Sequence, residues 1–442
     1  MKPVNVGLLG IGTVGGGTYT VLARNASEIA RRAGRPIQIT VIADRNPERA
    51  RKVVGAAGGG DNAVKFTDDA FAVVNDPAID VVVELIGGYG VTRELVLKAI
   101  ENGKHVVTAN KALLAVHGNE IFAAAQKKGV TVAFEAAVAG GIPIIKALRE
   151  GLAANRIEWV AGIINGTTNF ILSEMRDKGL PFADVLKEAQ RLGYAEADPT
   201  FDIEGIDAAH KATLMAAIAF GIPIQFDKAY VEGITRLEAI DIRYAEQLGY
   251  RIKLLGIARR REDGVELRVH PTLVPAKRLI ANVEGAMNAV LVKGDAVGAT
   301  LYYGKGAGAE PTASAVIADL VDVARSATTD PDNRVPHLAF QPDQLHDLSI
   351  LPIAEAETAA YLRLKVEDKP GVLADITRLL ADQSISIDAM LQREPEEGET
   401  DTDIIILTHR CKEKQINAAI ARIEALGAVK GKVTRLRLET LQ

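Results

Sequence analysis

An aspartate and a lysine four residues apart, Asp207 and Lys211, form a pair that could carry out proton chemistry. In a helix this spacing places both side chains on one face, which continues through the apolar Leu214 and Ile218. A lysine that turns away from water is either paired or used chemically with a shifted pKa. The spacing therefore predicts an inward-facing pair, and a surface salt bridge at the start of the helix is the alternative.

Further charged residues could meet a substrate beside this pair. Lys111 follows an expected strand, residues 105–108, and in open parallel sheets ligands bind beyond the carboxyl ends of the strands. Lys111 is therefore a candidate contact for substrate or cofactor, with a solvated loop lysine as the alternative. The stretch 193–207 is dense in acids, namely Glu196, Asp198, Asp202, Glu204 and Asp207.

The run G-I-G-T-V-G at residues 10–15 has the spacing of a dinucleotide-binding turn. It follows an apolar stretch, residues 4–9, and opens a helical one. Gly10 permits the tight turn, Gly12 lets the backbone approach a pyrophosphate, and Gly15 lets the helix pack on the sheet. The amides at the start of the helix would then bind the anion. An ordinary glycine-rich turn is the alternative.

The residues that follow the second expected strand, 37–43, could determine whether NAD(H) or NADP(H) binds. Asp44 stands where a carboxylate accepts the ribose hydroxyl of NAD(H). Arg45, Arg49 and Lys52 follow and could hold the 2′-phosphate of NADP(H), although a solvated helix face would explain all three. At this point NADP(H) and NAD(H) both remain open.

These candidates need a parallel sheet to position them, and the first part of the chain has that pattern. Apolar stretches alternate with helical ones, which is typical of βαβ units. We expect an α/β, Rossmann-type domain over residues 1–135, completed by a helix at 306–326. Its strands are expected at 4–9, 37–43, 81–86, 105–108 and 130–134.

The rest of the chain divides into three parts. Residues 136–305 group strands apart from helices, which predicts an α+β domain. The proline-containing span 327–355 is expected to be a linker. Residues 356–438 have the order βαββαβ, which predicts a separate ferredoxin-like module.

Composition narrows the classes of function. The 442 residues include 52 basic and 57 acidic ones, so no basic excess favours nucleic-acid binding. The longest apolar run, residues 212–224, is shorter than the roughly 20 residues that cross a bilayer. Cys411 is the single cysteine, and the seven histidines show no zinc-binding spacing. We expect a cytoplasmic protein with no membrane or nucleic-acid partner.

Several segments together resemble homoserine dehydrogenase, in its form with a C-terminal ACT regulatory domain. The resemblance spans the whole chain, and its middle segments are more specific than the glycine motif. The matching segments are G-I-G-T-V-G at 10–15, T-A-N-K-A at 108–112, F-E-A-A-V-A-G-G-I-P at 134–143, N-G-T-T-N-F at 165–170, G-Y-A-E-A-D-P at 193–199, D-I-E-G-I-D-A-A-H-K at 202–211 and G-A-G-A-E-P-T-A-S-A-V at 306–316.

The resemblance implies a role for each matching position. Lys211 would donate a proton to the substrate carbonyl oxygen, and Lys111 would lie near substrate and nicotinamide. Glu196 would bind the substrate amino group, and Asp202 and Asp207 would shape the same pocket. The reaction implied is the reduction of L-aspartate 4-semialdehyde to L-homoserine, the branch step toward threonine, methionine and isoleucine.

The resemblance also implies bound partners. Thr13 and Val14 match backbone positions that contact the cofactor, and Gly308 lies in a second cofactor loop. A monovalent cation, usually sodium, would be held mainly through backbone carbonyls at Glu135, Val138, Gly140 and Ile142. The resemblance makes residues 136–305 the catalytic and dimerisation domain, so a homodimer is implied, with a homotetramer available through the ACT domains.

The ACT module is expected to be regulatory and dispensable for chemistry. The resemblance places an amino-acid effector, with threonine as the first candidate, at the turn 368–371. Gly371 would allow close approach there, and the amides of Val372 and Leu373 could bind the carboxylate. A chain ending near Glu355 would then stay active and lose threonine inhibition. A dimerisation domain without a ligand is the alternative.

Two other functions compete with this hypothesis. Aspartate-semialdehyde dehydrogenase needs a cysteine nucleophile, whereas Cys411 lies in the C-terminal module between Arg410 and Lys412. A regulator that senses a dinucleotide without turnover would not need Asp207 and Lys211 on one apolar helix face. Both alternatives are therefore weaker.

Overall fold

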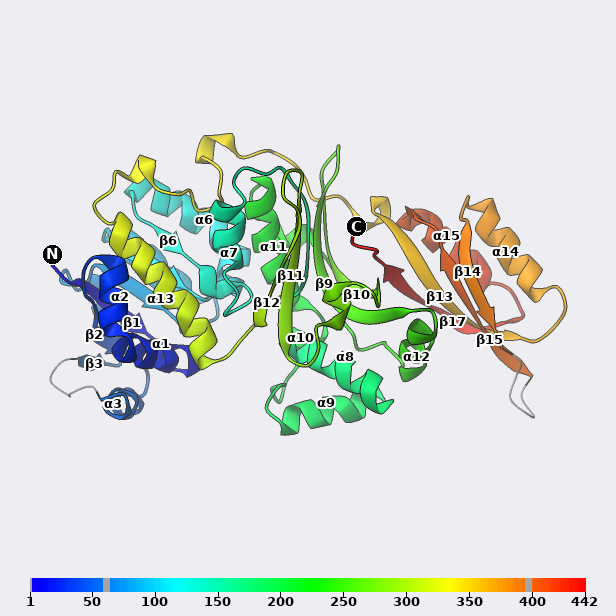
Figure 1. Cartoon of the computed structure of the whole chain (residues 1–442), viewed down its shortest axis with the longest axis horizontal. Coiled ribbons are helices and arrows are strands. Elements are labelled where there is room, and N and C mark those ends of the chain that lie inside the picture. The colour runs from blue at the N-terminus through cyan, green and yellow to red at the C-terminus, as the bar shows by residue number, and fades with distance from the viewer. Residues whose placement is uncertain (1, 59–63, 394–399) are drawn as a thin grey trace.

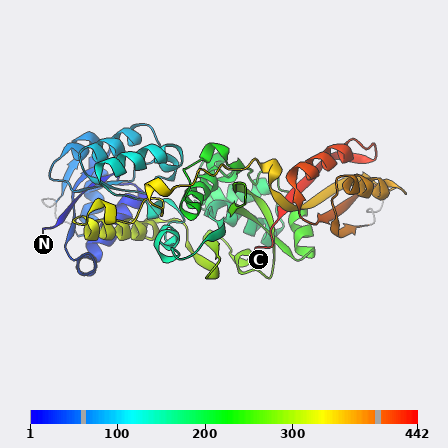
Figure 2. The same ribbon diagram turned by 90° about the horizontal axis from the view of Figure 1, so that it is seen from above.

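The computed structural model of the chain describes residues 2–58, 64–393 and 400–442. Within these residues the strands form two large sheets, one parallel and one mixed. The N-terminal, middle and C-terminal parts follow one another along the long axis (Figure 1). Figure 2 shows the same succession from above, with the N-terminus at one end and the ACT helices at the other. A site between neighbouring parts can therefore draw residues from both.

The first sheet is parallel throughout, in the order β3-β2-β1-β4-β5-β6. Successive strand residues, such as Leu8 and Leu9, are buried in different apolar clusters, so both faces are covered. This is the Rossmann-type sheet that the sequence predicts. Its strands are β1 Val4–Leu9, β2 Ile37–Ala43, β3 Lys65–Thr67, β4 Val81–Glu84, β5 His105–Thr108 and β6 Val132–Ala133.

Helices from two distant parts of the sequence cover this sheet. The expected helix near 306–326 is α13, Ala309–Ser326, and it packs against α1 (Figure 1). Gly17 allows this contact, since a Cβ there would lie 2.4 Å from the Ala309 carbonyl oxygen. The other helices are α1 Thr13–Arg24, α2 Ala26–Ala33, α3 Pro47–Ala56, α4 Ala70–Asn75, α5 Val91–Glu101 and α6 Lys111–Lys128.

Some local expectations for this part were wrong. The helical stretch after the glycine motif is two helices, because Asn25 interrupts it with a non-helical backbone. The strand expected at 81–86 ends at Glu84, whose carboxylate accepts the amides of Ile86 and Gly87 and turns the chain. The short strand β3 was not predicted, since it has three residues and is only partly buried.

The second sheet is mixed, in the order β12-β11-β7-β9-β10-β17-β13-β15-β14. Its first half belongs to the middle of the chain, where α11 lies across β9. Gly256 allows that approach, because a Cβ there would be 3.1 Å from the Cβ of Ala212. The strands are β7 Ile157–Ile163, β8 Tyr230–Val231, β9 Tyr250–Arg260, β10 Val265–Pro275, β11 Met287–Gly294 and β12 Gly298–Lys305.

Three helices of this middle part were expected, at 168–178, 182–192 and 205–220, and they are present as α8, α9 and α11, whereas α7, α10 and α12 were not predicted. The bounds are α7 Ile144–Lys146, α8 Gly166–Lys178, α9 Phe182–Arg191, α10 Thr200–Ile203, α11 Ile206–Phe220 and α12 Ala239–Gln247. Strands β9 and β12 were missed. The continuous apolar centre of β9 contains Gly256, and β12 is a half-exposed strand with glycines near both ends. In the described ranges, no helix has the length and apolar character needed to cross a membrane.

The C-terminal module has the predicted βαββαβ order, but its sheet is not separate. Strand β17 pairs in parallel with β10, with Thr272 opposite Arg437 and Leu273 opposite Leu438. The module therefore extends the central sheet. Its elements are β13 Glu357–Glu367, α14 Val372–Asp382, β14 Ile387–Gln392, β15 Asp401–Thr408, β16 Cys411–Lys412, α15 Glu413–Glu424 and β17 Val429–Leu438.

The span 327–355 has little regular structure, yet it packs onto the rest of the chain. The His337 ring stacks on Phe122, and its Nε2 accepts the Val132 amide at 3.0 Å. Leu338 and Ile350 are buried. The segment runs along one side of the molecule from the first sheet toward the ACT strands (Figure 1). The expected linker is therefore packed against the parts that it connects.

Candidate active site

The start of α11 meets the start of α6 in a cluster of one carboxylate and two ammonium groups. One oxygen of Asp207 lies 2.6 Å from the Lys211 Nζ, and the other lies 3.1 Å from the Lys111 Nζ. Lys211 also donates to the Ile164 carbonyl oxygen at 2.8 Å. The Lys211 side chain is 10% exposed and that of Lys111 is 35% exposed. Asp207 and Lys211 therefore point inward from the apolar face of α11. Lys111, which follows the end of β5, reaches the same cluster.

Burial and mutual charge set the ionisation of this cluster. Burial alone would raise the pKa of Asp207, but Lys211 and Lys111 outweigh it and hold that pKa well below its usual range. Burial lowers the pKa of Lys211, the Lys111 charge acts in the same direction, and Asp207 opposes both. An ammonium group with a lowered pKa gives up its proton more readily near neutral pH. The cluster is therefore built to hold a proton that it can release.

Asn165 orients the acids of the cluster, and it was not among the predicted site residues. Its side-chain amide donates to Asp202 at 2.7 Å and to Asp207 at 2.9 Å. Its carbonyl oxygen accepts the Thr168 amide at 2.9 Å and so caps α8. Burial raises the pKa of Asp202, against the effect of the Asn165 hydrogen bond. The available signal was an asparagine three residues before the helix expected at 168–178, which in the structure begins earlier, at Gly166.

The acid-rich segment contributes unequally to this cluster. Glu196 is exposed, and among the described residues its side chain makes no hydrogen bond or ion pair. Its loop is held nearby, because the Thr167 hydroxyl donates to the Tyr194 carbonyl at 2.7 Å. The neighbouring His210 is buried between Phe201 and Phe226, and burial lowers its pKa to about 4. This histidine is therefore a packing residue.

The glycine turn has the shape that a dinucleotide requires. Gly10 has a φ of +91°, and a Cβ at Gly15 would lie 2.0 Å from the Gly10 carbonyl oxygen. By contrast, a Cβ at Gly12 would meet no atom within 4 Å, so this backbone is open to a ligand. Thr13 and Val14 follow as the first residues of α1. The turn fits a pyrophosphate at the start of that helix.

The acid after β2 is already engaged with this turn. One oxygen of Asp44 accepts the Ile11 amide at 2.9 Å, and the other accepts the Asn46 amide at 2.9 Å. Arg45 is exposed beside it. Gly308 has a φ of +126° and directly precedes α13, which packs against α1. The positions proposed for the cofactor thus lie at the carboxyl edge of the sheet or at a helix start.

Glu84 is a buried carboxylate that was not among the predicted site residues. It helps to fix the backbone at the start of α6, where Lys111 lies. Glu84 ends β4, and its Oε2 accepts the hydroxyl of Thr108 at 2.7 Å. The Asn110 side chain donates to the Gly88 carbonyl at 2.6 Å and caps α6 through the Leu113 amide. Burial raises the pKa of Glu84. These contacts fix the backbone from which Lys111 reaches Asp207.

The four positions implied for a cation lie in one buried loop after β6. The carboxylate of Glu135 accepts the amides of Ile145 and Lys146 at 2.9 and 2.8 Å. Ala139 and Gly140 have φ values of +56° and +49°, which turn successive carbonyls in different directions. Val138, Gly140 and Ile142 lie along this stretch, and the Ile142 carbonyl oxygen accepts the Ile144 amide at 2.8 Å. The oxygen-rich donor set fits a hard cation.

Comparisons with known proteins agree with this architecture. Family models for homoserine dehydrogenase match residues 143–321, for its NAD binding domain residues 10–135, and for the ACT domain residues 360–428. A homoserine dehydrogenase of Pseudomonas aeruginosa is 65% identical, and each chain is covered fully.

Solved structures show the same relationship. A crystal structure of a homoserine dehydrogenase from Thiobacillus denitrificans has a TM-score of 0.95 and 70% identity, covering 100% of this chain and 99% of the other. A hyperthermophilic archaeal homoserine dehydrogenase mutant in complex with NADPH has a TM-score of 0.63 and 25% identity. It covers 74% of this chain and 99% of its own length. This chain therefore belongs to the homoserine dehydrogenase family and is an NAD(P)-dependent oxidoreductase.

Proposed function

We propose that this enzyme reversibly reduces L-aspartate 4-semialdehyde to L-homoserine, with NADPH or NADH as the hydride source. The observation that carries the proposal is the buried Lys211–Asp207–Lys111 cluster beside the carboxyl edge of a dinucleotide-binding sheet. An aldehyde reductase must deliver a proton to the carbonyl oxygen as the hydride reaches the carbon. The pathways that this product would feed lead to threonine, methionine and isoleucine.

In this mechanism Lys211 gives its proton to the carbonyl oxygen. Two of its three donors are directed to Asp207 and Ile164, which leaves one for the substrate. The second ammonium, Lys111, adds positive charge where the alkoxide develops and so stabilises it. The nicotinamide, when bound, supplies the hydride. Asp207 keeps both lysines in place.

The substrate is also a zwitterionic amino acid, and the acids of the segment 193–207 are proposed to bind its charged end. Glu196 would pair with the ammonium group, because its carboxylate is exposed on a loop tied to the start of α8. Asp202, held by Asn165, would shape the same pocket. The contacts of Glu196 in the structure do not include the cluster, so this role requires the substrate to bridge them.

The proposed reaction is tested by following nicotinamide absorbance at 340 nm with aspartate semialdehyde and, in reverse, with homoserine. We expect turnover that requires both substrate and cofactor. A protein that binds NADPH but oxidises none with aspartate semialdehyde would contradict the proposed function and favour a sensor. The proposed sodium site is tested by repeating the assay with choline in place of sodium. Loss of the bound cation should lower the turnover rate or the stability of the enzyme.

The proposed cation is sodium, bound at Glu135, Val138, Gly140 and Ile142. Two buried acids support it: Glu135 is 1% exposed, and its amide donates to the buried Asp319 at 2.8 Å. A cation would offset the charge of these neighbouring carboxylates. It would also hold the loop that joins the first sheet to the middle of the chain.

The preference between the two dinucleotides is proposed to depend on Arg45. This residue follows Asp44 at the carboxyl end of β2 and has no ion pair among the described residues. If Arg45 holds a 2′-phosphate, Arg45→Ala should weaken NADPH binding about tenfold or more and leave NADH almost unchanged. Dissociation constants for the two cofactors measure the difference. Equal effects on both would mean that Arg45 is only a surface residue.

The C-terminal module is proposed to regulate the enzyme by binding an amino acid, with threonine as the first candidate. Gly371 precedes α14 with a φ of +95°, and a Cβ there would meet no atom within 4 Å. The Val372 amide already donates to the Lys369 carbonyl at 3.4 Å, and the Leu373 amide in the first turn of α14 would bind the effector carboxylate. A homodimer or homotetramer in the cytoplasm is proposed for the assembly, as in the family resemblance.

A further inference from the structure

A short turn after β4, residues 85–90, contacts both the glycine turn and the start of α6. On one side, a Cβ at Gly10 would lie 2.9 Å from a backbone oxygen of this turn, so the two backbones touch. On the other side, the Asn110 side chain donates to the Gly88 carbonyl oxygen at 2.6 Å. Lys111 follows as the first residue of α6. The turn 85–90 therefore connects the part proposed to bind the cofactor with the second lysine of the active site.

This turn is exposed, and a buried carboxylate binds its backbone. Residues 86–90 are all exposed, and Gly87 and Gly88 have φ values of +85° and +71°. Glu84, which ends β4 just before the turn, is fully buried. Its Oε1 accepts the amides of Ile86 and Gly87 at 2.8 and 3.0 Å. The conformation of the turn therefore depends on this carboxylate.

Glu84, Thr108 and Asn110 close a ring of hydrogen bonds with the turn. The Thr108 hydroxyl donates to the Glu84 Oε2 at 2.7 Å, and its oxygen accepts the Asn110 amide at 3.0 Å. The Asn110 side chain then returns to the turn at Gly88. Because Glu84 ends β4 and Thr108 ends β5, this strand-end ring ties the carboxyl ends of the two strands together.

The side chains of the strand-end ring are buried. Glu84 and Thr108 are 0% exposed, and Asn110 is 7% exposed. Burial of a carboxylate costs free energy, which the hydrogen bonds that it accepts offset. An apolar side chain would fill the same space without this cost, but it could not join two amides to a hydroxyl group. The carboxylate is therefore better suited to fixing geometry than to adding stability.

We propose that Glu84 is a positioning residue, which acts through the strand-end ring to hold Lys111 at a fixed distance from the glycine turn. Lys111 lies 3.1 Å from Asp207, in the proton-donating cluster of Asp207, Lys211 and Lys111. The hydride and the proton must reach one carbonyl group, so cofactor and cluster must keep their spacing. A misplacement of about 1 Å can lower a rate about 100-fold. The proposal rests on the proposed function, because it assigns the ring to the same reaction.

Thr108→Val tests the proposal, because it removes the hydroxyl from the ring and keeps the shape of the side chain. We expect single-turnover hydride transfer from NADPH to aspartate semialdehyde to fall about 10- to 100-fold, with the dissociation constant of NADPH changed less than about threefold. Thr108→Ser keeps the hydroxyl and should retain most of the rate. Glu84→Ala should lower the rate as Thr108→Val does, because the turn then lacks the acceptor for its amides.

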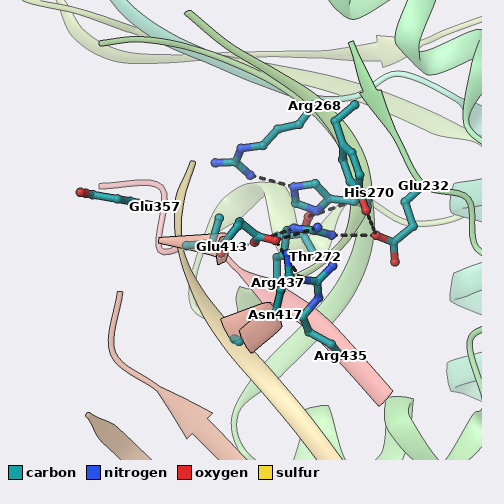
Figure 3. Close-up of polar contacts among 12 residues, drawn as sticks. Glu232, Arg268, His270, Thr272, Glu357, Glu413, Asn417, Arg435 and Arg437 are labelled. Carbon is teal, nitrogen blue, oxygen red and sulfur yellow. Dashed lines mark hydrogen bonds and ion pairs between the residues drawn. The ribbon is translucent and has the colours of Figure 1, made fainter. Parts of the chain in front are cut away.

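Thr358→Val is the matched control, since Thr358 also donates to a buried glutamate, Glu413, at 2.6 Å. Figure 3 shows Glu413 with Arg435 and Arg437 in the C-terminal module. Thr358 is 1% exposed, so its burial matches that of Thr108. The two valine variants should lose similar stability in thermal unfolding, but Thr358→Val should leave hydride transfer unchanged.

The placement of Lys111 is also measured without turnover, by carbon-13 NMR of the reductively methylated enzyme. Lys111→Arg assigns its signal, which should move toward those of exposed lysines in Thr108→Val and stay in place in Thr358→Val. Equal hydride-transfer rates in the two valine variants, or a Lys111 signal that does not move, would overturn the proposal. A moved signal in a protein that oxidises no NADPH with aspartate semialdehyde would reject the proposed function and leave the positioning of Lys111 standing.

Discussion

Lys211→Ala should reduce turnover about 100- to 10,000-fold, the usual loss when a general acid is removed. The cofactor should bind as before, because the glycine turn and Asp44 make no contact with Lys211. Stopped-flow measurement of NADPH oxidation gives the rate, and fluorescence titration gives the cofactor affinity. Near-normal turnover with unchanged cofactor affinity would refute the assignment of Lys211 as the proton donor.

Removal of any buried lysine can harm a protein, so this prediction needs a matched control. Lys253 is 1% exposed and donates to the Val283 carbonyl at 2.6 Å, outside the proton-donating cluster. Lys253→Ala should lower stability while turnover of the folded enzyme stays within a few fold. Equal losses of turnover in both variants would show that the Lys211 effect is structural.

Glu439→Gln should lower the free energy of unfolding by about 3–5 kcal/mol, because it leaves buried arginines with too little negative charge. Glu439 is 2% exposed and binds Arg268 at 2.5 Å and Arg259 at 2.9 Å. Urea unfolding followed by the fluorescence of the single tryptophan, Trp159, measures this, since Trp159 pairs opposite Arg259. Glu310→Gln is the control, because its pair with Arg24 is exposed and screened by solvent, so its loss should leave the free energy of unfolding almost unchanged.

The lowered pKa of Glu439 also predicts how the free energy of unfolding changes as the pH falls. Burial would raise the pKa of Glu439, but Arg268 and Arg259 outweigh it and lower that pKa to about 2. A carboxyl with a depressed pKa in the folded state stabilises the protein above its ordinary pKa, and this is lost as the pH falls toward 2. The stability difference between parent and Glu439→Gln should therefore shrink with acidification. A constant difference down to pH 3 would contradict the assignment.

The contacts of β17 and Glu439 with β10 also change the result that we expect from a shortened chain. A chain ending near Glu355 lacks β17 and Glu439, so it exposes the edge of β10 and leaves Arg268 buried without this partner. We now expect such a chain to be unstable, and its inactivity would not indicate that the ACT module takes part in chemistry. Point variants at the turn 368–371 are the cleaner test of regulation.

Local patterns predicted the first sheet well, because strand and helix periods and the glycine turn depend on neighbouring residues. They also predicted the inward orientation of Asp207 and Lys211, since a helix face is visible in the sequence. They could not reveal that Asn165 bridges Asp202 and Asp207, because that contact joins residues 42 positions apart. The pairing of β10 with β17 was missed for the same reason.

The contact between α1 and α13 has a consequence for synthesis on the ribosome. Strand β6 ends at Ala133, whereas α13 begins at Ala309. At roughly 5–20 residues per second, the interval between them takes on the order of ten seconds or more. Throughout this time the groove beside Gly17 stays uncovered, and the sheet face that will pack against Ala313, Val316 and Leu320 faces solvent. The nascent N-terminal half is therefore a natural client for chaperones until the distant helix arrives.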